Sequence, residues 1–241
     1  MKVNNIFKEG YFKDVSFDVR KGEILALTGL VGAGRTEVCQ NIFGIMTPDS
    51  GSIELEGKEV KIKSPIDALK LGIGLLAGNR QTQGLINELP IYQNVTSADM
   101  SKFIKAGKLD ESAEEAKAIE LCQKIQLKAK DISAPPSSLS GGNQQKVVIA
   151  KLLCCDPDVL IFDEPTVGVD VGAKEEIYKI MEELTAQGKS IILISSYLPE
   201  VMGLSDRLIV MAQGKITGEF ASEELKNLRE EDVLKRASIE S

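Results

Sequence analysis

Residues 139–145 read Leu-Ser-Gly-Gly-Asn-Gln-Gln, and residues 159–166, shortly after them, read Val-Leu-Ile-Phe-Asp-Glu-Pro-Thr. The first stretch is a Ser-Gly-Gly turn that opens a helical pattern, and such a turn presents backbone N–H groups and a hydroxyl that bind phosphate oxygens. The second stretch is an apolar strand that ends in two carboxylates. In a parallel sheet, such a strand would place its carboxylates at the carboxyl edge, where nucleotides bind. Together the two stretches predict a nucleotide-binding α/β domain.

A third Gly-rich stretch lies far upstream, where residues 29–36 read Gly-Leu-Val-Gly-Ala-Gly-Arg-Thr. Its spacing is that of a P-loop, in which backbone N–H groups between a strand and a helix surround a phosphate. Thr36 can offer its hydroxyl to Mg²⁺. Arg35 stands where the motif has lysine, and its planar guanidinium does not fill a slot shaped for a compact ammonium. Taken alone, a plain Gly-rich turn explains this stretch equally well.

Short apolar runs separated by glycines recur along the chain and predict strands. They lie at residues 15–19, 24–27, 53–55, 73–76, 159–162, 191–194 and 208–211, with a hairpin turn at Gly214-Lys215 that returns through 216–220. Helical patterns lie between them at residues 36–43, 65–71, 174–186 and 223–235. Strands that alternate with helices indicate an α/β domain with a mostly parallel central sheet.

Residues 86–138 interrupt this alternation. They contain a helical pattern over 111–125 and end in Ala-Pro-Pro-Ser-Ser, and a further helix is expected from about 142 to 154. We therefore expect one domain over residues 1–241. In it, residues 1–85 and 155–241 would form a core with a β subdomain, and residues 86–154 an inserted helical subdomain.

Composition excludes several classes of function. A formal net charge of −7 argues against a protein that grips nucleic acid. No run approaches the roughly 18 apolar residues of a membrane span, and the N-terminus has no apolar signal core, so we expect a soluble chain. The chain has no histidine, which removes every histidine-based general base and metal ligand.

In this order, the three stretches resemble the Walker A loop, the signature motif and the Walker B strand of the ATP-binding domain of an ABC transporter. The resemblance covers nearly the whole chain. It implies a P-loop NTPase fold of the ABC type with an N-terminal antiparallel β part, and ATP and Mg²⁺ as cofactors. Asp163 and Thr36 would hold Mg²⁺, and Glu164 would polarise the attacking water.

The resemblance also implies roles for further residues. The nucleotide of the chain's own loop would be bound by Gly29, Gly32, Ala33, Gly34, Arg35 and Thr36. The nucleotide of a partner domain would be bound by the signature residues Ser140, Gly141, Gly142, Asn143 and Gln144. We expect any side chain at Gly142 to enter the space of the partner's γ-phosphate. We expect Gly142→Asp to abolish transport and ATPase activity of the assembly while leaving the fold and the ATP affinity of the isolated chain nearly unchanged.

Three further positions have both a family role and a plainer interpretation. Asp170 matches the D-loop, which reaches across the dimer, and would also serve as a helix N-cap. Ser196 stands where most ABC ATPases have a histidine that contacts the γ-phosphate. Of the aromatic residues Phe7, Tyr11 and Phe12, Tyr11 is our candidate for stacking on adenine, although a place in the core or at a strand edge is the plainer interpretation of each.

The sequence resembles the second ATP-binding domain of monosaccharide importers of the ribose, galactose and xylose type in four segments, residues 29–37, 139–147, 163–174 and 194–201. In that group two such domains are fused in one polypeptide. The implied partners are a second ATP-binding domain, in the same polypeptide or in a dimer, transmembrane permease subunits and, indirectly, a periplasmic sugar-binding protein, with no nucleic acid. The chain would be cytoplasmic and peripheral on the inner face of the membrane.

The departures from the family pattern at Arg35, Gly78 and Ser196 all fall on the side of the chain's own Walker A loop. The group usually has Glu-Asp-Arg where this chain has Gly78-Asn79-Arg80. We therefore expect a weak site at this chain's own P-loop and a signature motif that completes a working site on the partner.

Two other functions stay open. A regulatory module that binds nucleotide without significant hydrolysis would share these motifs, although Asp163 and Glu164 favour hydrolysis. A non-transport ABC ATPase of the DNA-repair type would need a long coiled coil between the P-loop and the signature motif, and residues 37–138 show no sustained heptads.

Overall fold

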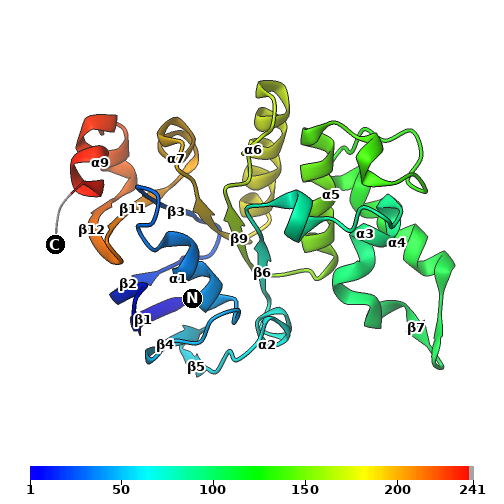
Figure 1. Ribbon diagram of the computed structural model, residues 1–241, viewed down its shortest axis with the longest axis horizontal. Coiled ribbons are helices and arrows are strands. Elements are labelled where there is room, and N and C mark those ends of the chain that lie inside the picture. Colours follow the sequence, from blue (N-terminus) through cyan, green and yellow to red (C-terminus); the bar gives the residue numbers. More distant parts are fainter. Residues whose placement is uncertain (239–241) are drawn as a thin grey trace. The chain divides into compact units, whose positions relative to one another are not determined.

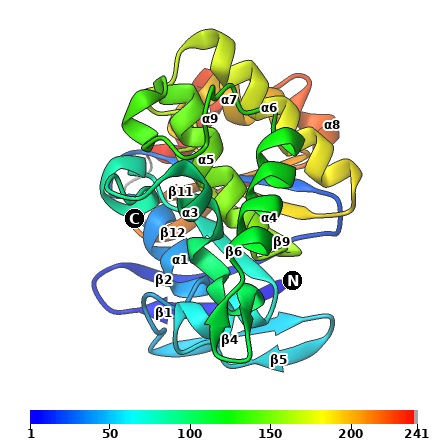
Figure 2. The ribbon, with the colours of Figure 1, turned by 90° about the vertical axis from the view of Figure 1, so that its right-hand side faces the viewer.

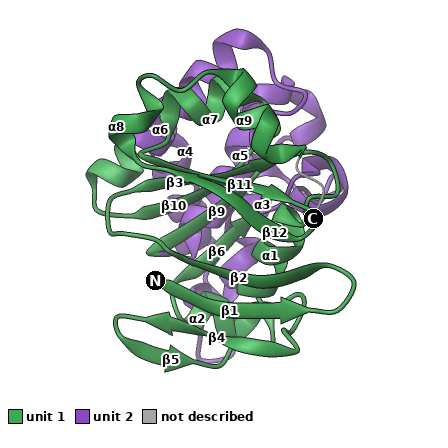
Figure 3. Cartoon of the chain, turned by 90° about the vertical axis from the view of Figure 1, so that its left-hand side faces the viewer, with its two compact units in different colours: residues 1–75, 158–164, 183–241 green, residues 76–157, 165–182 purple. Residues whose placement is uncertain are grey.

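The computed structural model describes residues 1–238, and the chain divides into two compact units (Figure 3). Unit 1 consists of residues 1–75, 158–164 and 183–241, and unit 2 of residues 76–157 and 165–182. The subdomain division expected from the sequence, at residues 86 and 155, stays a prediction. No helix within residues 1–238 is long and apolar enough to cross a membrane.

A six-stranded sheet forms the centre of unit 1, in the order β12-β11-β3-β10-β9-β6 (Figure 1). Its strands are β3 (Ile24–Gly29), β6 (Ile73–Leu76, the last residue of which belongs to unit 2), β9 (Val159–Asp163), β10 (Ser190–Ile194), β11 (Arg207–Ala212) and β12 (Lys215–Phe220). Strand β10 pairs in parallel with β3 and β9, β11 pairs in parallel with β3, and only the hairpin partner β12 runs antiparallel to β11. The predicted α/β fold with a mostly parallel sheet is confirmed.

A second sheet of unit 1 is antiparallel, in the order β2-β1-β4-β5. It consists of β1 (Lys2–Lys8), β2 (Phe12–Asp18), β4 (Ser50–Leu55) and β5 (Lys58–Val60). The sequence patterns missed β1, because Asn5 takes a left-handed backbone conformation (φ 47°) between the buried residues Val3 and Ile6. The resulting irregularity in pairing breaks the two-residue period by which a half-buried strand is recognised.

Helices cover both faces of the central sheet within unit 1 (Figure 3). They are α1 (Arg35–Ile42), α2 (Pro65–Lys70), α7 (Leu198–Leu204), α8 (Ser222–Leu225) and α9 (Glu230–Ala237). The central strands are buried on both sides, which is why they read as continuous apolar runs. The prediction of one helix over 223–235 is wrong. Arg229 is extended (φ −100°, ψ 150°) and its N–H donates to Asp232 Oδ2, so a new helix begins there.

Unit 2 is mainly helical. It contains α3 (Ile91–Thr96), α4 (Glu111–Lys124), α5 (Gly141–Cys154), most of α6 (Val171–Ala186), the short turns η1 (Arg80–Gly84), η2 (Ser97–Phe103) and η3 (Pro136–Ser138), and a hairpin of β7 (Ile104–Lys105) and β8 (Lys108–Leu109). Helices α3, α4 and α5 pack on one another (Figure 2). The helices predicted over 111–125 and 142–154 are therefore confirmed.

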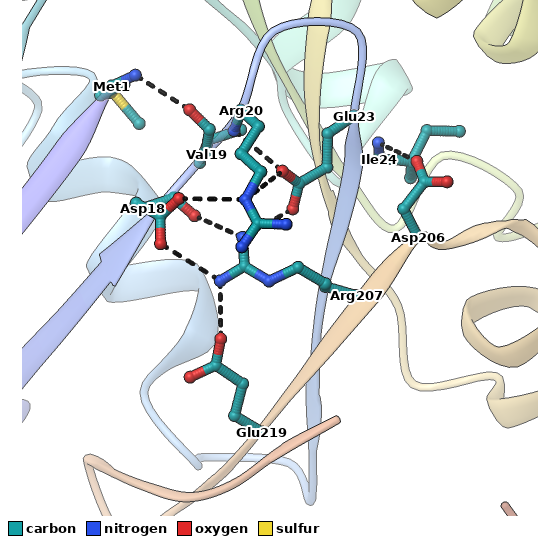
Figure 4. Close-up of polar contacts among 9 residues, drawn as sticks. All are labelled: Met1, Asp18, Val19, Arg20, Glu23, Ile24, Asp206, Arg207 and Glu219. Carbon is teal, nitrogen blue, oxygen red and sulfur yellow. Dashed lines mark hydrogen bonds and ion pairs between the residues drawn. The ribbon is translucent and has the colours of Figure 1, made fainter. Parts of the chain in front are cut away.

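An ion-pair network around the buried side chain of Arg207 joins β2, β11, β12 and the residue before β3 in unit 1 (Figure 4). Arg207, the first residue of β11, donates from Nη1 to Glu23 Oε1 (2.9 Å) and from Nη2 to Glu219 Oε1 (2.6 Å) and Asp18 Oδ1 (3.3 Å). The side chains of Arg207 and Glu23 are only 8% and 6% exposed. Because Arg207 starts its strand, this network lies at the edge of the sheet opposite the one from which the P-loop leaves.

Candidate functional site

The loop between β3 and α1 depends on its glycines. Gly29, Gly32 and Gly34 all have positive φ (152°, 81° and 96°). A Cβ on Gly29 would overlap the carbonyl oxygen of Met211, and one on Gly34 would lie 3.1 Å from the carbonyl oxygen of Tyr11. Because α1 begins directly after the loop, its first N–H groups have no acceptor within the helix. This geometry suits an anion at the start of α1.

Arg35, the first residue of α1, is buried, with its side chain 8% exposed. Its Nη1 has no hydrogen-bond partner among residues 1–238 and lies 3.8 Å from Glu164 Oε1. A buried cation without a hydrogen-bonded partner is unfavourable unless an anion completes its surroundings. The guanidinium is thus available to a phosphate group, although it is drawn toward Glu164.

Asp163 and Thr36 place two oxygen atoms side by side next to the P-loop. Thr36 Oγ1 and Asp163 Oδ1 are 3.4 Å apart. Burial raises the pKa of Asp163 to about 6, and the Glu164 carboxylate raises it as well, while the hydrogen bond from Thr36 lowers it. A carboxylate and a hydroxyl fit a hard divalent cation such as Mg²⁺. Within residues 1–238, no group of three or more acidic, cysteine or histidine side chains is arranged to hold a metal ion.

Glu164 is held in an uncommon conformation at the end of β9. Its φ is +46°, its N–H donates to the carbonyl oxygen of Ile194 (2.9 Å), and its Oε1 accepts from the N–H of Ser196 (2.9 Å). For a residue other than glycine, such a left-handed conformation persists only where its surroundings impose it, and it is frequent at functional sites. Ser196, the position where a histidine was expected, is thus brought to Glu164 by its backbone.

The three candidate aromatic residues have different surroundings. Phe12 is 3% exposed and belongs to the core, whereas Tyr11 is 51% exposed. The carbonyl oxygen of Tyr11 lies against Gly34, so this side chain is attached beside the P-loop. Phe7 is half-buried in β1. The structure excludes Phe12 as an exposed stacking surface and keeps Tyr11 as the candidate.

In unit 2, the signature residues form the start of α5. Ser140 precedes the helix and is exposed, and its Oγ accepts from Asn143 Nδ2 (3.0 Å). Asn143 Oδ1 accepts from the N–H of Lys128 (3.0 Å), and Gln144 Nε2 donates to the carbonyl oxygen of Pro136 (3.2 Å). These hydrogen bonds show that the side chains of Asn143 and Gln144 stabilise the turn that precedes α5. Ser140 itself is exposed to solvent.

The expectation that a side chain at Gly142 would leave the fold unchanged is wrong. Gly142 is buried, and a Cβ there would overlap the Cβ of Ala173 in α6. The backbone of α5 can approach α6 only because position 142 has no side chain. A substitution at Gly142 would therefore disturb helix packing in addition to any effect on a bound phosphate.

Asp170 is the N-cap of α6, which is the simpler of the two roles that the sequence suggested for it. Its Oδ1 accepts from the N–H of Ala173 (3.0 Å). The role in the D-loop stays a prediction.

The sequence patterns missed an ion pair between a buried lysine of α5 and a partly exposed glutamate of α6. Lys146 is 1% exposed, and its Nζ lies 2.8 Å from Glu176 Oε2 and donates to the carbonyl oxygen of Gln126 (2.9 Å). Lys128 Nζ lies 2.6 Å from the other oxygen of Glu176. A lysine followed by the apolar run 147–150 was the available signal, since a charge inside a buried helix requires a partner.

Replacing Glu176 by glutamine is expected to lower the free energy of unfolding more at neutral pH than at low pH. Hydrogen bonds from Lys128 and Lys146 lower the pKa of Glu176 from 4.5 to about 2. Its stabilisation is thus full above the unfolded-state pKa and is lost as the pH falls from about 4.5 toward 2. Urea unfolding of both proteins at about pH 6 and pH 3 measures the difference. Glu175→Gln, an equal change of charge at an exposed neighbour, is the control, and a pH-independent difference would contradict this assignment.

Comparison with known proteins shows which family has these sequence features. The family described as ABC transporter matches residues 12–167. The ribose import ATP-binding proteins of Oceanobacillus iheyensis and Lacticaseibacillus paracasei are 47% and 50% identical to this chain over 93% and 90% of its length. Those matches cover 45% and 44% of the relatives, so the chain spans less than half the length of the curated relatives it matches.

Solved structures agree with the fold. A nucleotide-free ATP-binding cassette from an ABC transporter superposes with a TM-score of 0.82 at 26% identity, covering 94% of this chain and 93% of the other. A cassette solved in its ADP conformation superposes with a TM-score of 0.80 at 26% identity, covering 94% and 92%.

Proposed function

Because the chain belongs to the ABC transporter family, as an ATP-binding domain, we propose that it binds and hydrolyses ATP together with a second ATP-binding domain to power sugar import. The observation that carries the substrate class is the identity of 47–50% to ribose import ATP-binding proteins. Those proteins are more than twice as long, which fits a second domain in the same polypeptide. The remaining partners would be transmembrane permease subunits and a periplasmic sugar-binding protein, with the chain on the inner face of the membrane.

The P-loop side of unit 1 would hold the chain's own nucleotide. The glycines of the loop, with Ala33, would let backbone N–H groups surround the phosphates, and Tyr11 would stack on the adenine. Thr36 and Asp163 would hold Mg²⁺, which when bound neutralises phosphate charge. Glu164, fixed by the N–H of Ser196, would accept a hydrogen bond from the attacking water and orient it.

We propose that this site is the weaker of the two in the assembly. Arg35 brings its charge to the P-loop but is 3.8 Å from Glu164, so the two groups partly neutralise one another in the absence of nucleotide. The backbone of Ser196 engages the same carboxylate, and its short side chain cannot replace an imidazole that reaches a γ-phosphate. Binding of nucleotide is supported here more strongly than turnover.

Arg35→Lys is expected to strengthen binding of ATP·Mg²⁺ at this chain's own site. A compact ammonium fits the P-loop slot and ends one bond short of the guanidinium nitrogen that lies 3.8 Å from Glu164, so both groups should become more available to the nucleotide. We expect a gain below about tenfold, equivalent to 1.4 kcal/mol, because Ser196 is unchanged. Isothermal titration of both proteins measures it, with Arg35→Gln as the control that should bind more weakly. Markedly weaker binding by the lysine variant would show that the pocket is built around the guanidinium.

Turnover tests the proposed function. The chain alone should hydrolyse ATP slowly, and adding a partner ATP-binding domain or the whole transporter should raise the rate. Equal rates in both conditions would contradict the shared sites. Absence of turnover in the whole transporter would favour the regulatory module, for which the engagement of Glu164 by Arg35 and Ser196 is the supporting observation.

A further inference from the structure

The side chain of Arg80 joins parts of unit 2 that are far apart in the sequence. Its Nη1 donates to the carbonyl oxygen of Val167 (2.7 Å) and its Nη2 to that of Gly168 (3.0 Å). A Cβ on Gly141, the first residue of α5, would lie 3.0 Å from Nη2 and 3.0 Å from the carbonyl oxygen of Gly168. The guanidinium therefore fills the space between the start of the signature helix and the segment that leads to Asp170.

The backbone around Arg80 is also held in place, by hydrogen bonds within the turn η1 and by contacts of this turn with α5. Asn79 Oδ1 accepts from the N–H groups of Gln81 (3.1 Å) and Thr82 (3.2 Å), which caps the turn η1. At the other end of that turn, a Cβ on Gly84 would lie 2.9 Å from Val148 Cγ2, and Lys151 Nζ donates to the carbonyl oxygen of Gly84 (3.2 Å). The turn η1 thus lies against α5 at both ends. These contacts hold the backbone of Arg80 in place while its side chain extends to the carbonyl oxygens of Val167 and Gly168.

The contacts need the shape of a guanidinium. Two successive carbonyl oxygens are bound by two nitrogen atoms in one plane, which the three rotatable N–H groups of a lysine cannot reproduce. Gly168 has a positive φ of 69°, and a Cβ there would lie 3.3 Å from Nη2, so the approach is close on this side too. Arg80 Nε is buried with no hydrogen-bond partner among the described residues.

The positive charge of Arg80 lies at the start of α5, which is an unfavourable position in the chain without a bound anion. The start of α5 carries the positive end of the helix dipole, and a cation there is destabilising on its own. A phosphate at Ser140–Gly142 would offset both charges. The arrangement is therefore better suited to a state in which an anion is bound at the signature motif.

We propose that Arg80 is a positioning residue for hydrolysis at the partner's nucleotide, which holds residues 140–142 and 167–170 in one fixed geometry. This inference rests on the proposed function, in which the signature motif completes the partner's site. Arg80 acts through the groups that it holds and contacts no nucleotide.

The test is made in the whole transporter with Arg80→Ala, Arg80→Lys and the control Gln81→Ala, whose side chain is exposed. We expect Arg80→Ala to lower kcat for ATP by about 10- to 100-fold with little change in KM, because misplaced groups slow chemistry more than binding. Arg80→Lys should recover only part of this loss, and Gln81→Ala should retain full activity. Affinity of the chain's own P-loop for nucleotide should be unchanged in all three.

Hydrogen exchange separates positioning from general destabilisation. In Arg80→Ala, exchange should rise at the amides of residues 139–144 and 166–172 and stay unchanged in the sheet of unit 1. Turnover of Arg80→Ala equal to that of Gln81→Ala would overturn the inference, as would a general loss of protection. Ser140→Arg in the same assay identifies which statement failed. If it is inactive while Arg80→Ala is active, only the role of Arg80 is lost, and if both are active, the signature assignment falls and the role of Arg80 with it.

Discussion

Arg207→Met is expected to lower the free energy of unfolding by about 3 kcal/mol, because it leaves the buried carboxylate of Glu23 without its hydrogen-bonded cation and with only the exposed Arg20, 3.9 Å away, as a charge partner. Glu23 is 6% exposed and receives its ion pair from Arg207 at 2.9 Å. Methionine keeps most of the length of the side chain, so the loss reports the charge more than the packing. Urea unfolding followed by circular dichroism measures the change.

Two variants make this expectation specific. Arg229→Met removes the cation of an ion pair that is 71% exposed on the arginine side, so it should lower the stability much less than Arg207→Met does. Adding Glu23→Gln to Arg207→Met removes the stranded charge while keeping an acceptor for the N–H of Arg20, and should recover most of the loss. If the double variant is as unstable as the single one, the unpaired carboxylate is not the cause.

Ser140→Arg is expected to reduce ATP turnover of the whole transporter by at least about 100-fold, the effect of losing a donor from a transition-state site. Ser140 is exposed at the start of α5, so the larger side chain enters the space proposed for the partner's phosphate without entering the core. It is a cleaner test than Gly142, where any side chain would meet Ala173. Steady-state ATPase assays measure the change, and the melting temperature should stay the same.

The matched control is Ser137→Arg, an equal substitution at an exposed position in the turn before α5. It should leave turnover unchanged. Arg35→Ala in the same transporter tests the asymmetry between the two sites and should be less damaging than Ser140→Arg, because it affects the site proposed to be weak. A larger loss from Arg35→Ala would mean that the productive site has been assigned to the wrong half.

The sequence by itself determined the family and most of the fold. The inner strands β3, β9, β10 and β11 of the central sheet are buried on both faces, so each is a mostly apolar run that local patterns detect. The P-loop and the signature turn were equally visible, since both depend on glycines at fixed spacing within a few residues. These features are local, and local features can be predicted from sequence.

The tertiary structure decided what depends on residues far apart in the chain. It placed Phe12 in the core and Tyr11 outside, gave Gly142 a packing role against Ala173, and broke the helix predicted over 223–235 at Arg229. Arg80 meets the carbonyl oxygens of Val167 and Gly168 across more than eighty residues of sequence. No local pattern encodes such a contact, because it arises only when packed helices and turns bring their ends together. The sequence therefore determined which motifs this protein carries, and the packing decided which side chains hold them in place.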